Sequence, residues 1–148
     1  DLKKNHNIHL IKFNRNYSKN LPKILCNPSQ LEQVFFNLIE NAAQAMSSWP
    51  DMNNPPKIDL KVQEINEMLS IEICDNGPGI GIDTQKRIFE PFFTTKEVGF
   101  GTGLGLSVSY FIITENHHGQ LSIDSRLDVG TCFCILLPMR IPQDDANL

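Results

Sequence analysis

The stretch of sequence that decides the fold is Asn37-Leu38-Ile39-Glu40-Asn41-Ala42-Ala43-Gln44. It lies within a helix that we predict from Pro28 to about Ser48. Asn27 can cap the first turn, Pro28 suits the first helical position, and Gln30 can complete a capping box. At about 3.6 residues per turn, one side of this helix is continuously apolar. That side consists of Leu31, Val34, Phe35, Leu38, Ile39, Ala42, Ala45 and Met46.

A narrow polar stripe runs along another side of the same helix and consists of Gln30, Gln33, Asn37, Glu40, Asn41 and Gln44. Asn37 and Asn41 are four residues apart and therefore project from one helical face. Their side-chain oxygens are neutral ligands of the kind that Mg²⁺ accepts when phosphate groups and waters complete its coordination. The alternative is an ordinary solvated face, and the stripe alone does not decide between them.

The apolar patterns after this helix predict a sheet. Residues 58–62 and 69–73 alternate apolar and polar side chains, which predicts an antiparallel hairpin with one buried face. Residues 121–125 and 131–137 predict two closing strands, residues 8–13 a short strand, and residues 24–26 a further apolar piece. A second helix is predicted from about 105 to 116, and a short helical segment after residue 83.

This order of elements favours an α+β fold. We expect a two-layer α/β sandwich, in which a mixed, mostly antiparallel sheet carries helices on one face. With 148 residues and no long linker, the chain is predicted to be one domain over residues 1–148.

A carboxylate and two glycines follow the second strand of the hairpin, in Asp75-Asn76-Gly77-Pro78-Gly79-Ile80. Asp75 can accept a hydrogen bond from an exocyclic amino group at this strand end. Gly77 and Gly79 would let a flat base approach the backbone without a Cβ clash. The same residues are also typical of an ordinary turn.

Two later segments carry candidate phosphate contacts. Phe89-Glu90-Pro91-Phe92-Phe93-Thr94-Thr95-Lys96 combines aromatic anchors with Lys96, which could reach a phosphate as a mobile point charge. Gly101-Thr102-Gly103-Leu104-Gly105-Leu106-Ser107 leads glycines into a helix start, where backbone N–H groups and the helix dipole favour an anion. This segment lacks the Walker pattern and follows a loop rather than a strand, so the dinucleotide-binding fingerprint does not apply.

Composition restricts the class of protein. The net charge is −4, with acidic and basic residues mixed along the chain, which argues against a nucleic-acid partner. No apolar run approaches the roughly 20 residues of a membrane span. We therefore expect no membrane contact by this chain and a cytoplasmic location, with anchoring of a longer parent left open. Cys132 and Cys134 should share one face of a strand. A metal pair is one alternative, but two small buried thiols in a reducing cytosol are the favoured interpretation.

Taken in order, the four segments resemble the N, G1, F and G2 boxes of sensor histidine kinases, which belong to the GHKL superfamily with DNA gyrase, the Hsp90 chaperone and mismatch-repair ATPases. The resemblance covers roughly residues 27–138. It extends to His117-His118-Gly119-Gln120-Leu121 and Gly130-Thr131-Cys132-Phe133, which look like the C-terminal strands of these kinases. The Phe-Phe-Thr-Thr-Lys form of the third segment is similar to that of nitrogen-regulation-type kinases. The resemblance implies the ATP-binding fold that these families share.

The resemblance also implies a role for each segment. Asn41 is expected to bind Mg²⁺, Asn37 to be its polar partner, and Asp75 to hold the adenine amino group. Together with Lys96, the two asparagines are the implied catalytic residues. The implied nucleotide-binding residues are Asn41, Asp75, Gly77, Gly79, Ile80, Phe89, Thr94, Thr95, Lys96, Gly101, Thr102, Gly103, Leu104 and Gly105. Residues 89–101 would form a lid over the nucleotide.

The implied function is to bind Mg²⁺–ATP and transfer its γ-phosphate to a histidine on a partner dimerisation and phosphoacceptor domain, with a response regulator downstream. None of His6, His9, His117 and His118 is in a phosphoacceptor context. The sequence therefore predicts a catalytic domain without its acceptor domain, and no phosphorylation of this chain by itself.

Two other functions remain open. Superfamily ATPases carry a Glu where Asn37 stands, and that Glu activates water as a general base, which an amide cannot do. Glu40 is about 60° from Asn37 around the helix, so an ATP-hydrolysing clamp is the alternative. A regulatory domain with decayed catalysis is the third hypothesis. One departure from the family also matters. Gln44-Ala45-Met46 stands where many kinases carry a basic residue and a Tyr, which would shift one phosphate contact to Lys96 or Arg87.

Overall fold

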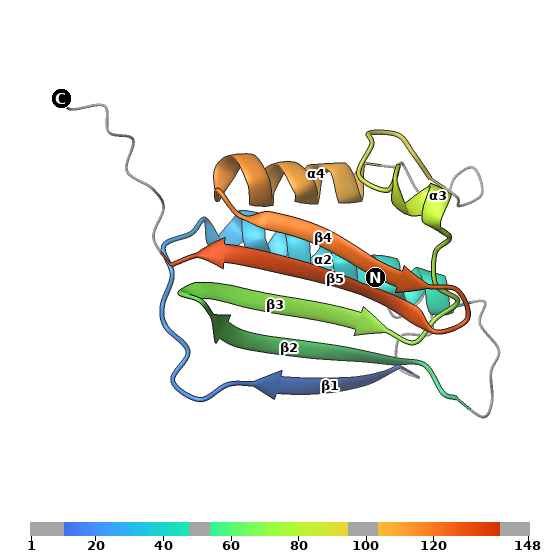
Figure 1. Ribbon diagram of the computed structural model, residues 1–148, viewed down its shortest axis with the longest axis horizontal. Coiled ribbons are helices and arrows are strands. Elements are labelled where there is room, and N and C mark those ends of the chain that lie inside the picture. The colour runs from blue at the N-terminus through green and yellow to red at the C-terminus, as the bar shows by residue number, and fades with distance from the viewer. Residues whose placement is uncertain (1–10, 48–53, 95–103, 140–148) are drawn as a thin grey trace.

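The computed structural model describes residues 11–47, 54–94 and 104–139, and these form a sheet with helices on one face (Figure 1). The sheet has five strands in the order β1-β2-β3-β5-β4. The strands are β1 (Lys12–Tyr17), β2 (Lys57–Ile65), β3 (Met68–Asp75), β4 (Gln120–Arg126) and β5 (Gly130–Pro138). The helices are α2 (Pro28–Met46), α3 (Ile82–Gln85), α4 (Gly105–Phe111) and the π-helical turn η2 (Ile112–Asn116). The predicted two-layer α+β sandwich is confirmed.

The sheet is mixed because β1 pairs with β2 in parallel, whereas the other pairs are antiparallel. The predicted hairpin is β2 and β3, and its turn residues Asn66 and Glu67 have φ of 51° and 63°. Two consecutive positive φ values are the geometry of a type I′ turn, which matches the right-handed twist of the two strands. The first strand was placed too early, since β1 begins at Lys12 and residues 8–10 lie outside the described part of the chain. Residues 24–26, which were predicted only as an apolar piece, are irregular.

Helix α2 begins where the sequence predicts. The Asn27 side chain accepts a hydrogen bond from the Gln30 backbone N–H at 3.2 Å, which confirms the cap. The predicted capping box is wrong, because the Asn27 backbone N–H donates to His117 Nε2 at 3.0 Å. The Gln30 side chain instead accepts from Asn116 Nδ2 at 3.3 Å. Tertiary contacts have therefore replaced the local partner.

The buried side of α2 differs from the predicted side near its C-terminal end. The buried residues are Leu31, Val34, Leu38, Ala42, Ala43 and Met46. Ala45 was predicted to face the core and is exposed, whereas Ala43 is fully buried. Phe35 and Ile39 are partly buried against the core, as expected.

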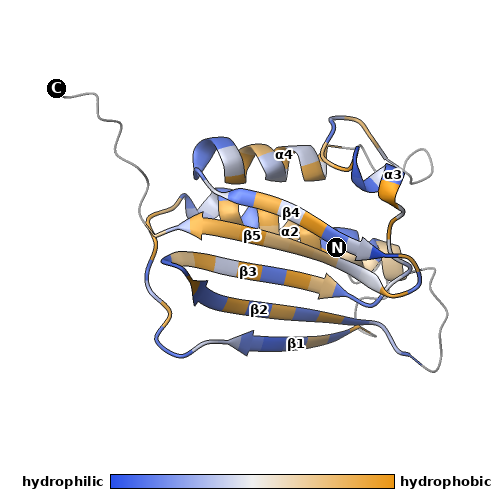
Figure 2. Ribbon diagram, in the orientation of Figure 1, coloured by the Kyte–Doolittle hydropathy of each residue, from blue (hydrophilic) through white to orange (hydrophobic). Residues whose placement is uncertain are grey.

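The core lies between the sheet and the helices on one face, where α2 and α4 pack side by side. Hydropathy follows this arrangement, with β5 apolar along most of its length, β2 alternating and β1 mostly hydrophilic (Figure 2). No described helix covers the opposite face of the sheet, which we call the open face. Within the described residues, no helix combines the length and the hydropathy that a membrane span needs.

The cysteines also depart from the prediction. Cys132 and Cys134 occupy alternate positions of β5, as expected, and both are partly exposed rather than buried. Cys132 is not a free thiol, because it forms a disulfide with Cys74 of β3. No local sequence pattern indicated this disulfide, because the two cysteines are 58 residues apart.

Candidate functional site

Asp75 is the last residue of β3 and the most perturbed carboxylate of the described residues. Its Oδ1 accepts the Gly77 backbone N–H at 2.8 Å. Burial raises the pKa of Asp75 from 3.8 to about 6, although hydrogen bonds from the backbone N–H groups of Gly77 and Thr131 lower it. A carboxylate that is partly removed from water is a good acceptor for a hydrogen-bond donor of a ligand. Residues with such shifted pKa values are candidates for functional sites.

Gly77 packs closely beside that carboxylate. A Cβ atom at Gly77 would lie 2.9 Å from Asp75 Oδ1 and 3.1 Å from Met46 Cγ. The end of β3 and the last turn of α2 therefore border Gly77 on two sides, and any side chain at this position would meet them. We call this part of the molecule, around Asp75 and Gly77, the cradle. That Gly77 lets a flat group approach the backbone stays a prediction.

The turn after Asp75 is held by the hairpin between β4 and β5. The Asp128 N–H donates to the Pro78 carbonyl at 2.8 Å, and the Ile80 N–H donates to Ser125 Oγ at 2.8 Å. Gly79 has a φ of +75°, and a Cβ there would collide with the Arg126 carbonyl. Gly79 is thus required by the turn itself. Nothing in the sequence indicated Ser125, because it contacts the turn from 45 residues away.

Asn76 fastens the same turn from the other side. It is buried, its Oδ1 accepts the Lys57 N–H at 2.8 Å, and its Nδ2 donates to the Pro55 carbonyl at 2.9 Å. These bonds join the turn to the start of β2. Asn76 therefore positions the cradle without facing a ligand.

The polar stripe of α2 reaches the start of α4. Asn37 Nδ2 donates to the Gly105 carbonyl at 3.1 Å and to Ser109 Oγ at 3.2 Å. Asn41 lies one turn further along the same face and is partly buried. Gln44 comes one turn later, and its Oε1 is buried without a hydrogen-bond partner in the part of the chain that the structure describes. A buried acceptor with no partner is costly, which indicates that a ligand, an ion or water satisfies it.

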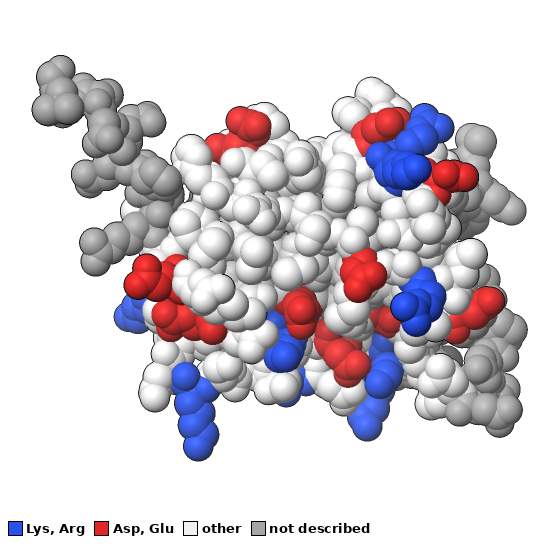
Figure 3. Space-filling view, viewed as in Figure 1, with Lys and Arg blue, Asp and Glu red and all other residues white. Residues whose placement is uncertain are grey.

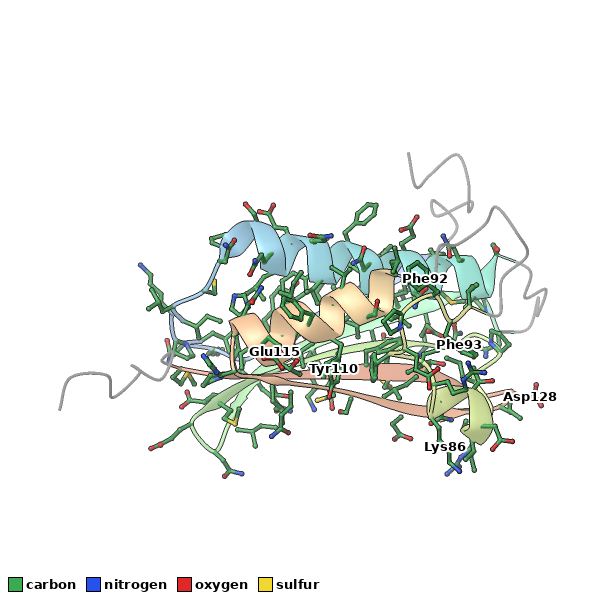
Figure 4. All side chains as sticks on the ribbon, turned by 90° about the horizontal axis from the view of Figure 1, so that it is seen from above. Lys86, Phe92, Phe93, Tyr110, Glu115 and Asp128 are labelled. Carbon is green, nitrogen blue, oxygen red and sulfur yellow. A yellow bond between two sulfur atoms is a disulfide. The ribbon has the colours of Figure 1, made fainter. Side chains whose placement is uncertain are left out.

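Phe89 anchors the beginning of the predicted lid. Its ring centroid lies 5.0 Å from that of Tyr110 on α4 and 6.4 Å from that of Phe133 on β5. Figure 4 shows Phe92 and Phe93 at the end of the molecule that also carries Asp128. Arg87 lies 4.5 Å from the Phe93 ring centroid and 3.0 Å from Glu90 Oε2. Arg87 is therefore engaged locally, which counts against its suggested role as a substitute phosphate contact.

The glycine-rich segment is described only from Leu104 onwards. The predicted residues Thr95, Lys96, Gly101, Thr102 and Gly103 lie outside the described residues, as does most of the predicted lid. Thr94 and Leu104 border this part of the chain. A Cβ at Gly105 would lie 3.7 Å from Asn37 Cγ, which is an ordinary contact. The fold itself therefore does not demand a glycine at the first residue of α4.

These contacts bring three of the predicted segments together along α2. Met46 lies against the cradle beside Asp75, Asn37 is bonded to the start of α4, and Asn41 and Gln44 lie between these two points. The site therefore has an acceptor carboxylate at one end, amide groups in the middle and a helix start at the other.

Comparisons with known proteins agree with this arrangement. Residues 26–141 match the family described as "Histidine kinase-, DNA gyrase B-, and HSP90-like ATPase". The chain is 45% identical over 120 residues to sporulation kinase E of Bacillus subtilis, with 81% of the chain and 15% of the relative covered. It is 38% identical over 148 residues to the sensory histidine kinase/phosphatase NtrB of Rhizobium leguminosarum, with 93% of the chain and 37% of the relative covered.

Solved structures show the same fold. The catalytic domain of the histidine kinase ThkA superposes with a TM-score of 0.77 at 27% identity, over 94% of this chain and 87% of that one. Full-length ShkA in complex with AMPPNP superposes with a TM-score of 0.75 at 25% identity, over 93% of this chain and 27% of that one. The chain spans well under half the length of the curated relatives that it matches.

Proposed function

The chain belongs to the histidine kinase-, DNA gyrase B- and HSP90-like ATPases, as the ATP-binding domain of a sensor histidine kinase, and from this premise we propose how it acts. It binds Mg²⁺–ATP and presents the γ-phosphate to a histidine on a partner dimerisation and phosphoacceptor domain. A response regulator then receives the phosphoryl group, in the cytoplasm where ATP is available.

The cradle at Asp75 is the observation that carries the proposal. A partly buried carboxylate beside a glycine offers an acceptor for the exocyclic amine of adenine, and the missing Cβ at Gly77 would let the flat base approach the backbone. Guanine carries a carbonyl in place of that amine, so the same carboxylate would reject it. ShkA was solved with AMPPNP, a non-hydrolysable form of ATP, which supports the same ligand class here.

The middle of the site fits a hydrated magnesium ion. Asn41 would hold the ion through its amide oxygen, and the unpartnered Oε1 of Gln44 can accept a hydrogen bond from a water of its shell. The ion would neutralise charge on the phosphates. Gln44 replaces the basic residue of many kinases, and an acceptor suits a water better than it suits a phosphate oxygen.

The chain's own contribution to phosphoryl transfer would be positioning. Asp75 fixes the base, the α2 stripe lies along the phosphates, and the backbone N–H groups at the start of α4 face the phosphate end. Lys96 and the glycines before α4 would complete the phosphate contacts, as the resemblance implies.

Asn37 favours a kinase over the alternative, an ATP-hydrolysing clamp. Both of its bonds run from the amide nitrogen to acceptors, the Gly105 carbonyl and Ser109 Oγ. A glutamate has no N–H to donate and would leave the Gly105 carbonyl without this bond. Position 37 therefore suits an amide, which connects α2 to α4. An amide cannot act as a general base for water.

The test is phosphotransfer in trans with γ-³²P-ATP. The chain alone should label none of its histidines and should hydrolyse ATP slowly. Mixed at high concentration with the phosphoacceptor domain of its own kinase, it should produce acid-labile label on that domain. Asp75→Asn should abolish most of this label at low ATP concentration. Rapid ATP turnover by the chain alone would favour the clamp, and label on His117 or His118 would overturn the assignment of the acceptor.

A further inference from the structure

Three of the four cysteines of the chain lie on the open face of the sheet. Cys74 of β3 and Cys132 of β5 are directly opposite each other and form a disulfide. Cys134 is two residues further along β5, so it projects from the same face, and it is a free thiol.

The disulfide is adjacent to a residue pair that contains Asp75, whose carboxylate we propose binds adenine. Asp75 follows Cys74 and pairs with Thr131, which precedes Cys132. The Thr131 backbone N–H is hydrogen-bonded to the Asp75 carboxylate. The crosslink therefore fixes the distance between the two strands one residue away from the group that would recognise the base.

The same strand also supports the rest of the cradle. Gly130 packs so closely on the Asp75 carbonyl that a Cβ there would collide with it. Thr131 Oγ1 lies 2.7 Å from Ser125 Oγ, which in turn accepts the Ile80 N–H. A shift of β5 relative to β3 would thus reach both the carboxylate and the turn that borders it.

The bridge lies where a small oxidant or reductant can reach it. Cys74 and Cys132 are both partly exposed, and no described helix lies over the open face. Figure 3 views this face and shows most of its charged side chains over β1, β2 and the α3 corner, with fewer over β4 and β5. Burial raises the pKa of the free thiol of Cys134; a hydrogen bond with Ser70 lowers this pKa and the nearby Glu72 raises it further, so Cys134 is a weakly reactive thiol.

We propose that Cys74 and Cys132 are a reversible thiol–disulfide modification site that sets the nucleotide affinity of the domain, with the disulfide form binding more tightly. The inference rests on the proposed function. Intracellular disulfides are usually transient or redox-sensing, which fits a bridge beside a ligand site. Tighter binding follows because the bridge holds Thr131 and Gly130 in the positions that support Asp75.

The chemistry is an exchange with a small disulfide such as glutathione disulfide. One cysteine thiolate attacks a sulfur of the small disulfide, whose S–S bond breaks and releases one glutathione thiolate. The second cysteine thiolate then attacks the protein sulfur of the mixed disulfide and releases the second glutathione. The protein loses two protons and two electrons, and the small disulfide gains both.

The first test measures ADP affinity by calorimetry on the 148-residue chain, oxidised with glutathione disulfide or reduced with dithiothreitol. We expect reduction to weaken binding by roughly fivefold, at the low end of measured couplings between two sites. Cys134→Ser, a matched change on the same strand and face, should keep this redox dependence. Cys74→Ser with Cys132→Ser should bind ADP as the reduced chain does under both conditions.

A reciprocal test does not depend on the variants folding. Because coupling acts equally in both directions, saturating ADP should shift the dithiol–disulfide equilibrium in a glutathione buffer by the same factor, read by thiol labelling and mass spectrometry. Labelling of Cys74 or Cys132 after treatment with glutathione disulfide would overturn the proposal, as would equal ADP affinity in both states. No ADP binding in either state would instead overturn the proposed function.

Discussion

Asp75 shows at the scale of one residue how binding and stability oppose each other. Its carboxylate is partly buried beside Gly77, and its folded-state pKa of about 6 lies above the ordinary value of 3.8. The folded protein therefore binds the Asp75 proton more tightly than the unfolded chain does. The contribution of Asp75 to stability is fully present below about pH 4 and is lost as the pH rises through about 6.

We expect Asp75→Asn to stabilise the domain while weakening its nucleotide binding. Near pH 8 the variant should gain up to about 3 kcal/mol in free energy of unfolding, since a charged group is no longer desolvated. Its affinity for ADP should fall by about 10–100-fold, because a hydrogen bond to a charged acceptor is lost. Urea denaturation measures the stability and calorimetry measures the ADP affinity. A variant that is less stable than the wild type and binds ADP equally tightly would contradict this account.

The pH dependence of binding gives a second prediction for the same residue. The adenine amine needs the ionised carboxylate as acceptor, so the ADP dissociation constant should be constant above about pH 7. It should rise by about tenfold for each pH unit below about 6. Asp75→Asn should show no such dependence, and a wild-type profile that is flat to pH 5 would rule out Asp75 as the acceptor.

Gly77 and Gly81 form a matched pair of substitutions. Gly77→Ala places a Cβ 2.9 Å from Asp75 Oδ1 and 3.1 Å from Met46 Cγ, whereas Gly81→Ala meets nothing within 4 Å. We expect Gly77→Ala to lower adenosine affinity by at least about tenfold, as overpacking costs about 1–3 kcal/mol. Gly81→Ala should leave it unchanged. Equal affinities for the two variants would mean that the base does not approach the backbone at Gly77.

At the scale of an element, helix α4 combines a supporting and a binding role. Its first carbonyl, at Gly105, receives the amide of Asn37, and the same carbonyl accepts the Ser109 hydroxyl at 2.8 Å. The helix then passes into the π-helical turn η2 before His117. Such turns often occur at functional sites, and no sequence pattern predicted this one.

A single substitution separates the two roles of α4. In Gly105→Ala the new Cβ makes an ordinary 3.7 Å contact with Asn37 Cγ, so the fold should be kept or slightly stabilised. A phosphate that approaches the helix start closely would meet that methyl group. We expect ADP binding to weaken by about tenfold or more, with adenosine binding unaffected. Parallel titrations of both ligands test this, and equal losses for both would place the phosphates elsewhere.

At the scale of the whole molecule, His117 connects the start of α2 to η2. Its Nε2 accepts the Asn27 N–H at 3.0 Å, which leaves Nδ1 to donate to the Ile112 carbonyl at 2.9 Å. The start of α2 is thereby fixed to η2, 90 residues later in the chain. Because both ring nitrogens of this buried histidine are engaged, we expect that it accepts no phosphoryl group.

His117→Ala should therefore destabilise the domain by about 2–4 kcal/mol, since two backbone groups lose their partner and a cavity remains. The neighbouring His118 is exposed and has a φ of 53°, so His118→Asn is the matched control and should cost little. Thermal unfolding of both variants measures the difference. Similar unfolding temperatures for the two would show that the His117 bonds contribute little.

The sequence by itself determined the order of elements, the fold class and the family. The cap at Asn27, the alternation in residues 58–62 and 69–73, and the apolar patterns of residues 121–125 and 131–137 act over a few residues, so their consequences are visible in the local pattern. The spacing of the four boxes then placed Asp75 and Asn41 in a nucleotide-binding family. The roles of these residues toward a ligand stay predictions.

Only the tertiary structure decided which groups meet. Asn37 contacts Gly105 and Ser109 from 68 and 72 residues away, and the disulfide closes across 58. Whether Ala43 or Ala45 is buried, and whether Gln30 caps α2 or binds Asn116, depends on the elements packed against α2 rather than on α2 itself. Such choices follow from packing and from partners distant in the chain, which local propensity does not encode.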